Sequence, residues 1–200
     1  MNNNVSNKQI NQLAIPAIIA GVSEPILSLT DAAIVGHMPL NATVSLAAVG
    51  IVSSFLSMLI WVLGQSRSAI SSIISQYLGA NKLKEVKSLP AQAISIILIL
   101  SVFICAATIP FSEAIFKFYN ASGLLLDYSV EYYKIRIIGF PFTLYTFAVF
   151  GVFRGLQNTY HPMVIAIFGT ATNIVLDLVL VYGITNIIDP MNLKGAALAS

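Results

Sequence analysis

Charged residues are scarce in this sequence, and cysteine is almost absent. Only 9% of the 200 residues are Asp, Glu, Lys or Arg, whereas 57% are hydrophobic. A soluble domain carries roughly 25% charged residues, so the composition excludes a water-soluble globule. The net charge of +2 is too small to indicate a nucleic-acid partner. The single cysteine, Cys105, excludes a disulfide within the chain.

The sequence motifs of many enzymes and nucleotide-driven pumps are absent as well. There is no Walker phosphate-binding loop, no His/Cys cluster with metal-ligand spacing and no Gly-x-Ser-x-Gly elbow. The first eight residues are polar and lack the pattern of a cleavable signal. We therefore predict a protein that is not an enzyme and binds no cofactor, and whose first span directs its own membrane insertion.

Long apolar runs are what the sequence does contain, and they predict an all-α, polytopic membrane helix bundle. Barrel strands would be shorter and would alternate in polarity. We predict about six transmembrane helices, the second followed by an amphipathic segment that ends near Gly79. The chain stops two turns into the sixth, so we expect it to be a piece of a longer protein. The predicted spans are 13–38, 45–66, 89–111, 124–153, 163–184 and a sixth from 195.

A carboxylate lies inside the fifth span. Asp177 is surrounded by apolar residues, and Asn173 and Thr170 precede it by four and seven positions. At 3.6 residues per turn these three side chains share one helix face. A carboxylate in hydrocarbon costs about 2.5–3.5 kcal/mol or more, so it needs a partner, water or a ligand. We predict that Asp177 takes up a proton or cation with Asn173 and Thr170 beside it; the alternative is a polar cluster that only locks two helices together.

The first span carries two carboxylates and two prolines. Asp31 and Glu24 are seven residues apart and therefore on one face, which indicates either a cation or proton site or a carboxylate near a membrane interface. Glu24 is a possible extra titrating group, although a carboxyl beside a proline can also bond freed backbone. Pro16 and Pro25 each remove a backbone donor, so we expect a helix kink at both.

Lysine and arginine set the orientation. Lys82, Lys84 and Lys87 form the most basic loop, on the same side as the N-terminus, which places the N-terminus in the cytoplasm. On the opposite side, Glu131 and Lys134 are three residues apart, and we expect them to neutralise each other at the interface. The predicted location is the plasma (inner) membrane, which the chain crosses several times.

Six short motifs, spread in order over nearly the whole chain, resemble the multidrug and toxin extrusion (MATE) transporters, specifically their DNA-damage-inducible F-like (DinF-like) branch. No single motif is specific for this family, but the six motifs together are. The motifs are LAIPAI at 13–18, DAAIVGH at 31–37, SQYLGA at 75–80, RGLQNTYHPM at 154–163, NxxxD at 173–177 and GAALAS at 195–200.

The resemblance implies a twelve-helix transporter in two six-helix lobes, of which residues 1–200 would be the N-terminal lobe with its last helix incomplete. A C-terminal lobe would then lie outside this chain. Such transporters export organic cations in exchange for H⁺ or Na⁺. The family's N-lobe cation site would comprise Asp31, Asn173 and Asp177, with Ser200 in place of a sixth-helix threonine. Pro16 matches a proline proposed to let the first helix bend on protonation, and Leu27 stands where some members have tyrosine.

Two carboxylates on neighbouring helices suit the exchange of an organic cation for H⁺ or Na⁺. Asp31 and Asp177 repel each other when both are ionised in low dielectric, so one is expected to hold a proton near neutral pH. An incoming organic cation would then compete with that proton. Na⁺ held by Asp31, Asn173 and Asp177 is the other coupling ion that these oxygens allow, and no other metal site is expected.

Three further readings compete with the antiporter. One is a flippase for lipid-linked substrates of the same superfamily, for which Arg67 is the deepest candidate arginine. The second is a membrane-embedded enzyme with a paired-aspartate site. The third is a truncated chain that only assists assembly or regulation. The expected partners of an antiporter are a small organic cation and the lipid bilayer.

Overall fold

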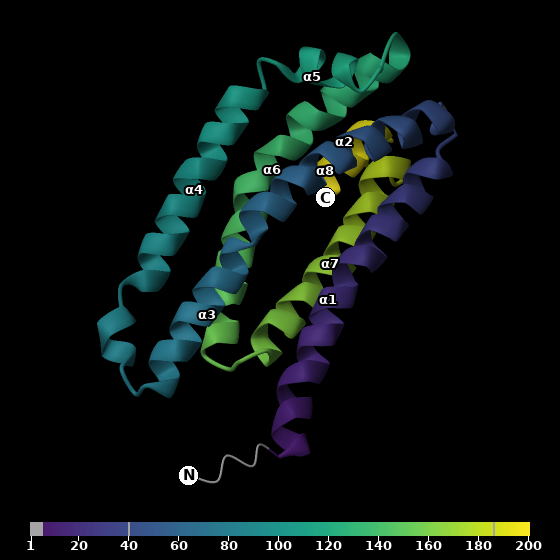
Figure 1. Cartoon of the computed structure of the whole chain (residues 1–200). Coiled ribbons are helices and arrows are strands. Elements are labelled where there is room, and N and C mark those ends of the chain that lie inside the picture. The colour runs from purple at the N-terminus through teal and green to yellow at the C-terminus, as the bar shows by residue number, and fades with distance from the viewer. Residues whose placement is uncertain (1–5, 40, 186) are drawn as a thin grey trace.

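The computed structural model describes residues 6–39, 41–185 and 187–200, and these residues form a helical bundle without a regular strand (Figure 1). One isolated antiparallel bridge joins Ile184 and Ile188 after the seventh helix. The helices are α1 (Asn7–Gly36), α2 (Ala42–Gly64), α3 (Ser66–Gly79), the 3₁₀ turn η1 (Leu83–Val86), α4 (Leu89–Thr108), α5 (Ser112–Phe118), α6 (Leu124–Gly155), α7 (Tyr160–Tyr182) and α8 (Leu193–Ala199).

Five helical segments are long and apolar enough to cross a membrane, which confirms the helical membrane bundle. They are α1, α2 with α3, α4 with the turn before it, α6 and α7. The predicted amphipathic segment is α3, which buries Ile70 and Ile74 and ends at Gly79. The beginning of the sixth predicted span is α8.

Several predicted boundaries differ from the observed helix ends, and two of the differences have a clear physical reason. The first helix begins at Asn7 and not at residue 13, because Ser6 and Gln9 form a capping box around its first turn. The third span was predicted to reach residue 111, but α4 ends at Thr108 and the short helix α5 follows. Pro110 interrupts the helix there, and a Glu113–Lys117 pair supports the new one.

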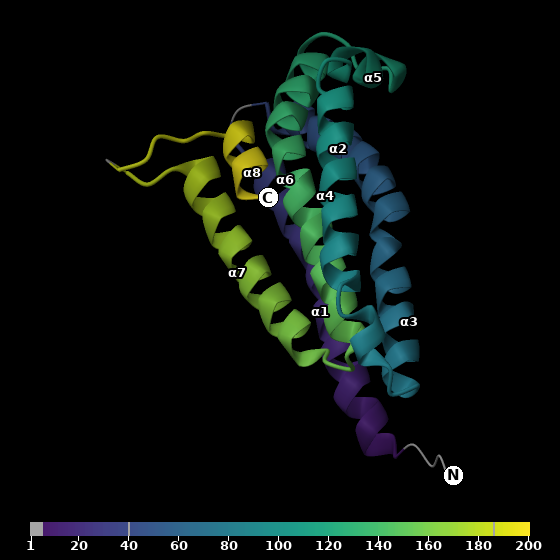
Figure 2. The ribbon, with the colours of Figure 1, turned by 90° about the vertical axis from the view of Figure 1, so that its left-hand side faces the viewer.

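α6 is the central helix of the bundle. It packs against α2, α3 and α4, whereas α1 pairs mainly with α7. Figures 1 and 2 show α1 and α7 side by side, and α8 between α7 and α6. α8 thereby contacts both groups of helices at one end of the bundle.

Aromatic packing fixes α6 against its neighbours. Tyr133 of α6 meets Phe55 of α2 and Phe116 of α5 edge to face, with ring centroids 5.7 and 5.3 Å apart. Large apolar side chains cover the outside, among them Trp61 and Phe103, each more than half exposed. In a bilayer these groups face lipid, which is the arrangement that the composition predicts.

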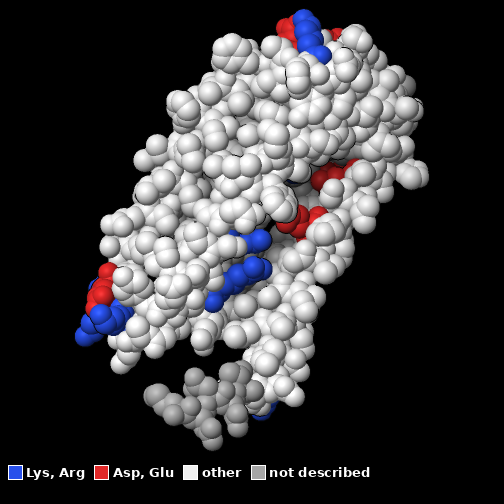
Figure 3. All heavy atoms as spheres, viewed as in Figure 1, with Lys and Arg blue, Asp and Glu red and all other residues white. Residues whose placement is uncertain are grey.

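The basic loop lies at the end of the bundle that carries the N-terminus. Figure 1 places the α3–α4 and α6–α7 connections at the end where α1 begins, the α1–α2, α4–α5, α5–α6 and α7–α8 connections at the opposite end, and the break between α2 and α3 between the two ends. Lys82, Lys84 and Lys87 belong to the first of these connections. In Figure 3 most of the visible face is uncharged, and basic and acidic side chains lie in its hollowed middle.

The predicted pairing of Glu131 with Lys134 is wrong. Glu131 instead bonds Lys194, with 2.9 Å between the ammonium nitrogen and the carboxylate oxygen. Lys194 comes from the first turn of α8, which packs against α6. The pair therefore ties α8 to α6, a tertiary contact that spacing along one helix does not reveal.

The ion pair of α5 gives a prediction about pH. The Lys117 ammonium donates to the Glu113 carboxylate at 2.6 Å and lowers the pKa of Glu113 below its ordinary value. The pair therefore supports α5 above that ordinary pKa, and this support is lost as pH falls through the lowered value. Lys117→Gln should raise the pKa of Glu113, as followed by carboxyl ¹³C NMR. Lys82→Gln, which breaks a different exposed pair, should leave it unchanged.

Candidate cation-binding site

Asp177 is the most deeply buried charged residue of the described chain. Its side chain lies in the second half of α7 and is 0% exposed. Both carboxylate oxygens are buried and lack a hydrogen-bond partner within the described residues. A fully buried carboxylate without donors is costly unless it binds a proton or a cation.

Asp31 faces Asp177 from the neighbouring helix. It is 8% exposed in the last third of α1, and its charge acts directly on the Asp177 carboxyl. The Ser200 hydroxyl donates to Asp31 Oδ2 at 3.2 Å, while Asp31 Oδ1 is buried without a partner among the described residues. The structure thus brings together the two aspartates that the sequence placed on different spans.

Asn173 joins the aspartates one turn before Asp177. Its amide nitrogen donates to the Ala199 carbonyl at 2.8 Å, which fixes the amide and ties α7 to α8. Its amide oxygen is buried and unpartnered within the described chain. Asn173 is 7% exposed, so water does not replace the missing partner freely.

Four buried acceptor oxygens therefore converge at the junction of α1, α7 and α8: Asp31 Oδ1, Asn173 Oδ1 and both oxygens of Asp177. All are hard oxygen donors, which suit a proton or a small hard cation such as Na⁺. The described residues hold no group of three His, Cys, Asp or Glu side chains that would suit a transition metal. We call these residues, together with Ser200, the acidic cluster.

The sequence analysis missed two residues of α6 that adjoin the acidic cluster. Arg136 acts on Asp177, and its guanidinium donates to the Ser200 carbonyl. Tyr132 is 2% exposed and feels the charges of Arg136 and both aspartates. Tyr132 and Arg136 are four residues apart, so their shared helix face was the signal that could have found them.

Several predicted residues lie outside the acidic cluster. Thr170 is half-buried two turns before Asp177, and its hydroxyl makes no hydrogen bond within the described chain. Glu24 is exposed and is not brought into the buried cluster. Pro16 and Pro25 both lie inside α1, which continues through them, so their role in bending stays a prediction.

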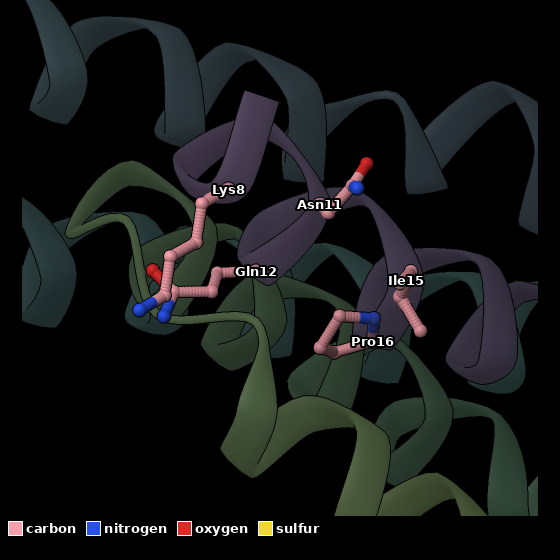
Figure 4. A pocket seen from close by; sticks show the side chains of 5 residues that line it. All are labelled: Lys8, Asn11, Gln12, Ile15 and Pro16. Carbon is pink, nitrogen blue, oxygen red and sulfur yellow. The ribbon is translucent and has the colours of Figure 1, made fainter. Parts of the chain in front are cut away.

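A hydrogen bond supports α1 beside Pro16. The Thr159 hydroxyl, at the start of α7, donates to the Leu13 carbonyl at 3.0 Å, within the turn that a proline weakens. A shallow, open hollow lies nearby, lined by Lys8, Gln12, Pro16 and two further α1 residues (Figure 4). In Figure 4 Lys8 and Gln12 extend to the same side, whereas Asn11 points away from them.

Thr159→Val is expected to lower the stability of the full-length protein by about 1 kcal/mol, because the Leu13 carbonyl loses its side-chain donor. Thermal unfolding in detergent measures this loss. Thr146→Val is the matched control, since the Thr146 hydroxyl only bonds a carbonyl of its own helix. Equal effects of the two substitutions would contradict a special role for the contact at Pro16.

Comparison with known proteins places this geometry in a family. The family model MatE matches residues 16–179. DNA damage-inducible protein F of Escherichia coli K12 is 29% identical over 98% of this chain and 41% of that protein. A probable multidrug resistance protein NorM of Thermotoga maritima is 26% identical over 96% of this chain and 41% of its own length.

Solved structures agree. A MATE crystal structure in the bent conformation superimposes with a TM-score of 0.85 at 25% identity, covering 96% of this chain and 41% of that one. The chain thus spans about two fifths of the length of the proteins that it matches, which corresponds to an N-terminal lobe. On the family match, the relatives and the shared fold, this chain belongs to the MATE family of multi-pass membrane transporters.

Proposed function

We propose that the full-length protein containing this chain is a secondary antiporter that exports organic cations in exchange for H⁺ or Na⁺. The observation that carries the proposal is the set of four buried, unpartnered oxygens of Asp31, Asn173 and Asp177. These oxygens favour whatever positive charge reaches them. Relatives described as multidrug resistance proteins support drugs as the exported class.

The charges of the acidic cluster limit what it takes up. When both aspartates are ionised, Arg136 compensates one of them, and one negative charge is left over. Arg136 does not form an ion pair with either aspartate among the described residues, so both carboxylates keep free oxygens. One proton or one Na⁺ per N-terminal lobe neutralises the cluster, and no organic cofactor is needed.

Coupling follows from competition for that single charge. A carboxylate that has taken up a proton or Na⁺ attracts an organic cation less, and an organic cation near the cluster favours release of the ion. The α1–α7–α8 junction supports a mechanical link, because Asp31, Asp177 and Ser200 come from three different helices. Relative movement of these helices changes the distances between the oxygens of the acidic cluster. Pro16 provides the weak point in α1 at which such movement bends the helix.

The proposal also includes the membrane in which the protein lies and the side on which its N-terminus is found. We place the protein in the plasma (inner) membrane with its N-terminus in the cytoplasm, because the lysines of the α3–α4 connection lie at the N-terminal end of the bundle. The C-terminal lobe of the full-length protein is the partner that completes the transport path. The reaction that we propose is transport, without covalent chemistry on the substrate.

The test uses the full-length protein in sealed proteoliposomes loaded with a fluorescent organic cation. A proton gradient is imposed without Na⁺, and a Na⁺ gradient is imposed separately at equal pH. We expect one gradient to drive export and thereby to identify the coupling ion. If neither gradient moves the dye, the antiporter proposal fails, and a lipid-scrambling assay becomes the next measurement.

A further inference from the structure

Helices α3 and α6 approach each other unusually closely at the end that carries the N-terminus. A methyl group on Gly151 would lie 2.7 Å from the Arg67 backbone oxygen, and one on Gly155 would lie 2.7 Å from the Ile74 Cβ. Two glycines four residues apart create a flat strip that allows this approach. The backbones of the two helices are therefore almost in contact at Arg67.

This close approach brings two arginines together. Arg67 is on α3, and Arg154 lies three residues beyond Gly151 on α6; the two charges act on each other. Both side chains are half-buried, and the Arg154 Nε is buried without a hydrogen-bond partner in the described chain. No carboxylate of the described residues is within ion-pair distance of either guanidinium.

The positive charge of Arg67 is partly stabilised by an aromatic ring. The Arg67 guanidinium lies 4.9 Å from the centre of the Phe147 ring, which is a favourable cation–π geometry. Such a contact orients the side chain but adds no negative charge. Two partly desolvated cations that act on each other are left without a carboxylate partner among the described residues, and an anion beside them would compensate both charges.

The depth of the pair in the membrane indicates which anion. The helix axis from Ala42 to Arg67 rises about 38 Å at 1.5 Å per residue, more than the hydrocarbon core of about 30 Å. Arg154 lies in the last turn of the long α6, immediately before the last residue of that helix, Gly155. A span that begins at Ala42 leaves a hydrocarbon core of this thickness before it reaches Arg67, which favours the level of the phosphate-rich lipid headgroups for both arginines.

We propose that Arg67 and Arg154 form a phosphate-binding site at the N-terminal end of the bundle, separate from the acidic cluster. Planar guanidinium groups bind phosphate oxygens in pairs of parallel hydrogen bonds, and the unpartnered Arg154 Nε is one available donor. The glycine strip keeps the two guanidinium groups near one another before the ligand arrives. This site does not depend on the exchange of cations proposed above.

The experiment measures ligand binding by the full-length protein in detergent, as the shift of its thermal unfolding midpoint with ligand concentration. Dihexanoyl phosphatidic acid and inorganic phosphate are the two probes, and dihexanoylglycerol is the lipid without phosphate. Arg67→Gln or Arg154→Gln should weaken binding at least about tenfold, since each removes charge-assisted hydrogen bonds. Lys87→Gln, an exposed charge at the same end, should change binding less than twofold, a difference of about 0.4 kcal/mol.

A conservative variant guards against loss of folding. Arg154→Lys keeps the charge but loses the forked geometry, so it should bind phosphate more weakly than the wild type and more tightly than Arg154→Gln. Weakening for both probes identifies the phosphate group itself as the ligand. Weakening for one probe alone supports the site and assigns its source as a lipid headgroup or a free phosphate.

Two results would overturn the proposal. One is the absence of a midpoint shift in the wild type with either phosphate probe. The other is an equal shift in the wild type and both arginine variants. Either result is expected if a carboxylate from the rest of the full-length protein neutralises the arginine pair.

Discussion

Asp177→Asn is expected to abolish gradient-driven export by the full-length protein while leaving that protein at least as stable as the wild type. Export is lost because the amide neither takes up a proton at neutral pH nor carries the negative charge that attracts a cation. The remaining Asp31 is then compensated by Arg136, and the cluster has no net charge to exchange. We expect the export rate to fall at least about a hundredfold, which corresponds to roughly 2.7 kcal/mol.

Stability is expected to move in the opposite direction because of the hydrogen bonds at this site. In the wild type with both aspartates ionised, four acceptor oxygens meet without a donor among the described residues. The substitution replaces one acceptor by an amide NH₂, which can donate to the Asp31 and Asn173 oxygens. Removing an unsatisfied buried acceptor and a buried charge relieves about 1–3 kcal/mol.

Paired measurements of dye export and thermal unfolding test this prediction. Asp127→Asn is the matched control, because Asp127 is an exposed aspartate in the first turn of α6, and it should leave both quantities unchanged. If the acidic cluster only locks helices together, Asp177→Asn will instead lower the unfolding midpoint and leave export per folded molecule intact. That outcome would remove the basis for the proposed antiport.

The acidic cluster could be predicted in large part because charge is so rare in this chain. Asp31, Asn173 and Asp177 stand in apolar runs, so helical spacing and the cost of a buried charge were enough to select them. Their convergence was not available from spacing. It depends on the packing of α1 against α7, which the resemblance to MATE transporters implied and the structure shows.

Glu24 shows where the periodicity argument fails. It shares a helix face with Asp31, yet Asp31 is buried and Glu24 is exposed. Ser200 contacts Asp31, whereas Glu24 lies two turns away from that contact along α1. Burial of a residue on a helix face depends on which segment packs against that particular turn, and hydrophobic spacing does not record this.

Arg136 was missed for a related reason. Its neighbours in sequence include Glu131 and Lys134, and a group of charges near the start of a span usually indicates an interface. In the structure α6 is the central helix, so different faces of the same turn meet solvent and the cluster. The predicted pairing of Glu131 with Lys134 was wrong for the same reason, because the observed partner, Lys194, comes from α8.

Gly151→Ala is expected to cause a large loss of stability, because the added methyl group meets the backbone of α3. The added methyl would lie 2.7 Å from the Arg67 backbone oxygen and 3.1 Å from its Cα. These are backbone atoms, so no side chain can rotate away, and α3 must move as a whole. Overpacking of this kind costs about 1–3 kcal/mol.

Gly139→Ala is the matched control on the same helix. A methyl group there has no atom within 4 Å, and alanine favours a helix over glycine by about 1 kcal/mol. The control is therefore expected to be neutral or stabilising. Unfolding of both variants of the full-length protein in detergent measures the difference, and equal midpoints would contradict the close approach of α3 and α6.

The same substitution links stability to the arginine pair. Displacing α3 from α6 increases the distance between Arg67 and Arg154 without altering either side chain. Gly151→Ala should therefore weaken the binding of phosphatidic acid or phosphate, while Gly139→Ala should not. Weaker phosphate binding in a variant that keeps both arginines would show that their spacing, and not only their charge, forms the site. Unchanged binding despite a lowered unfolding midpoint would show that the glycines serve packing alone.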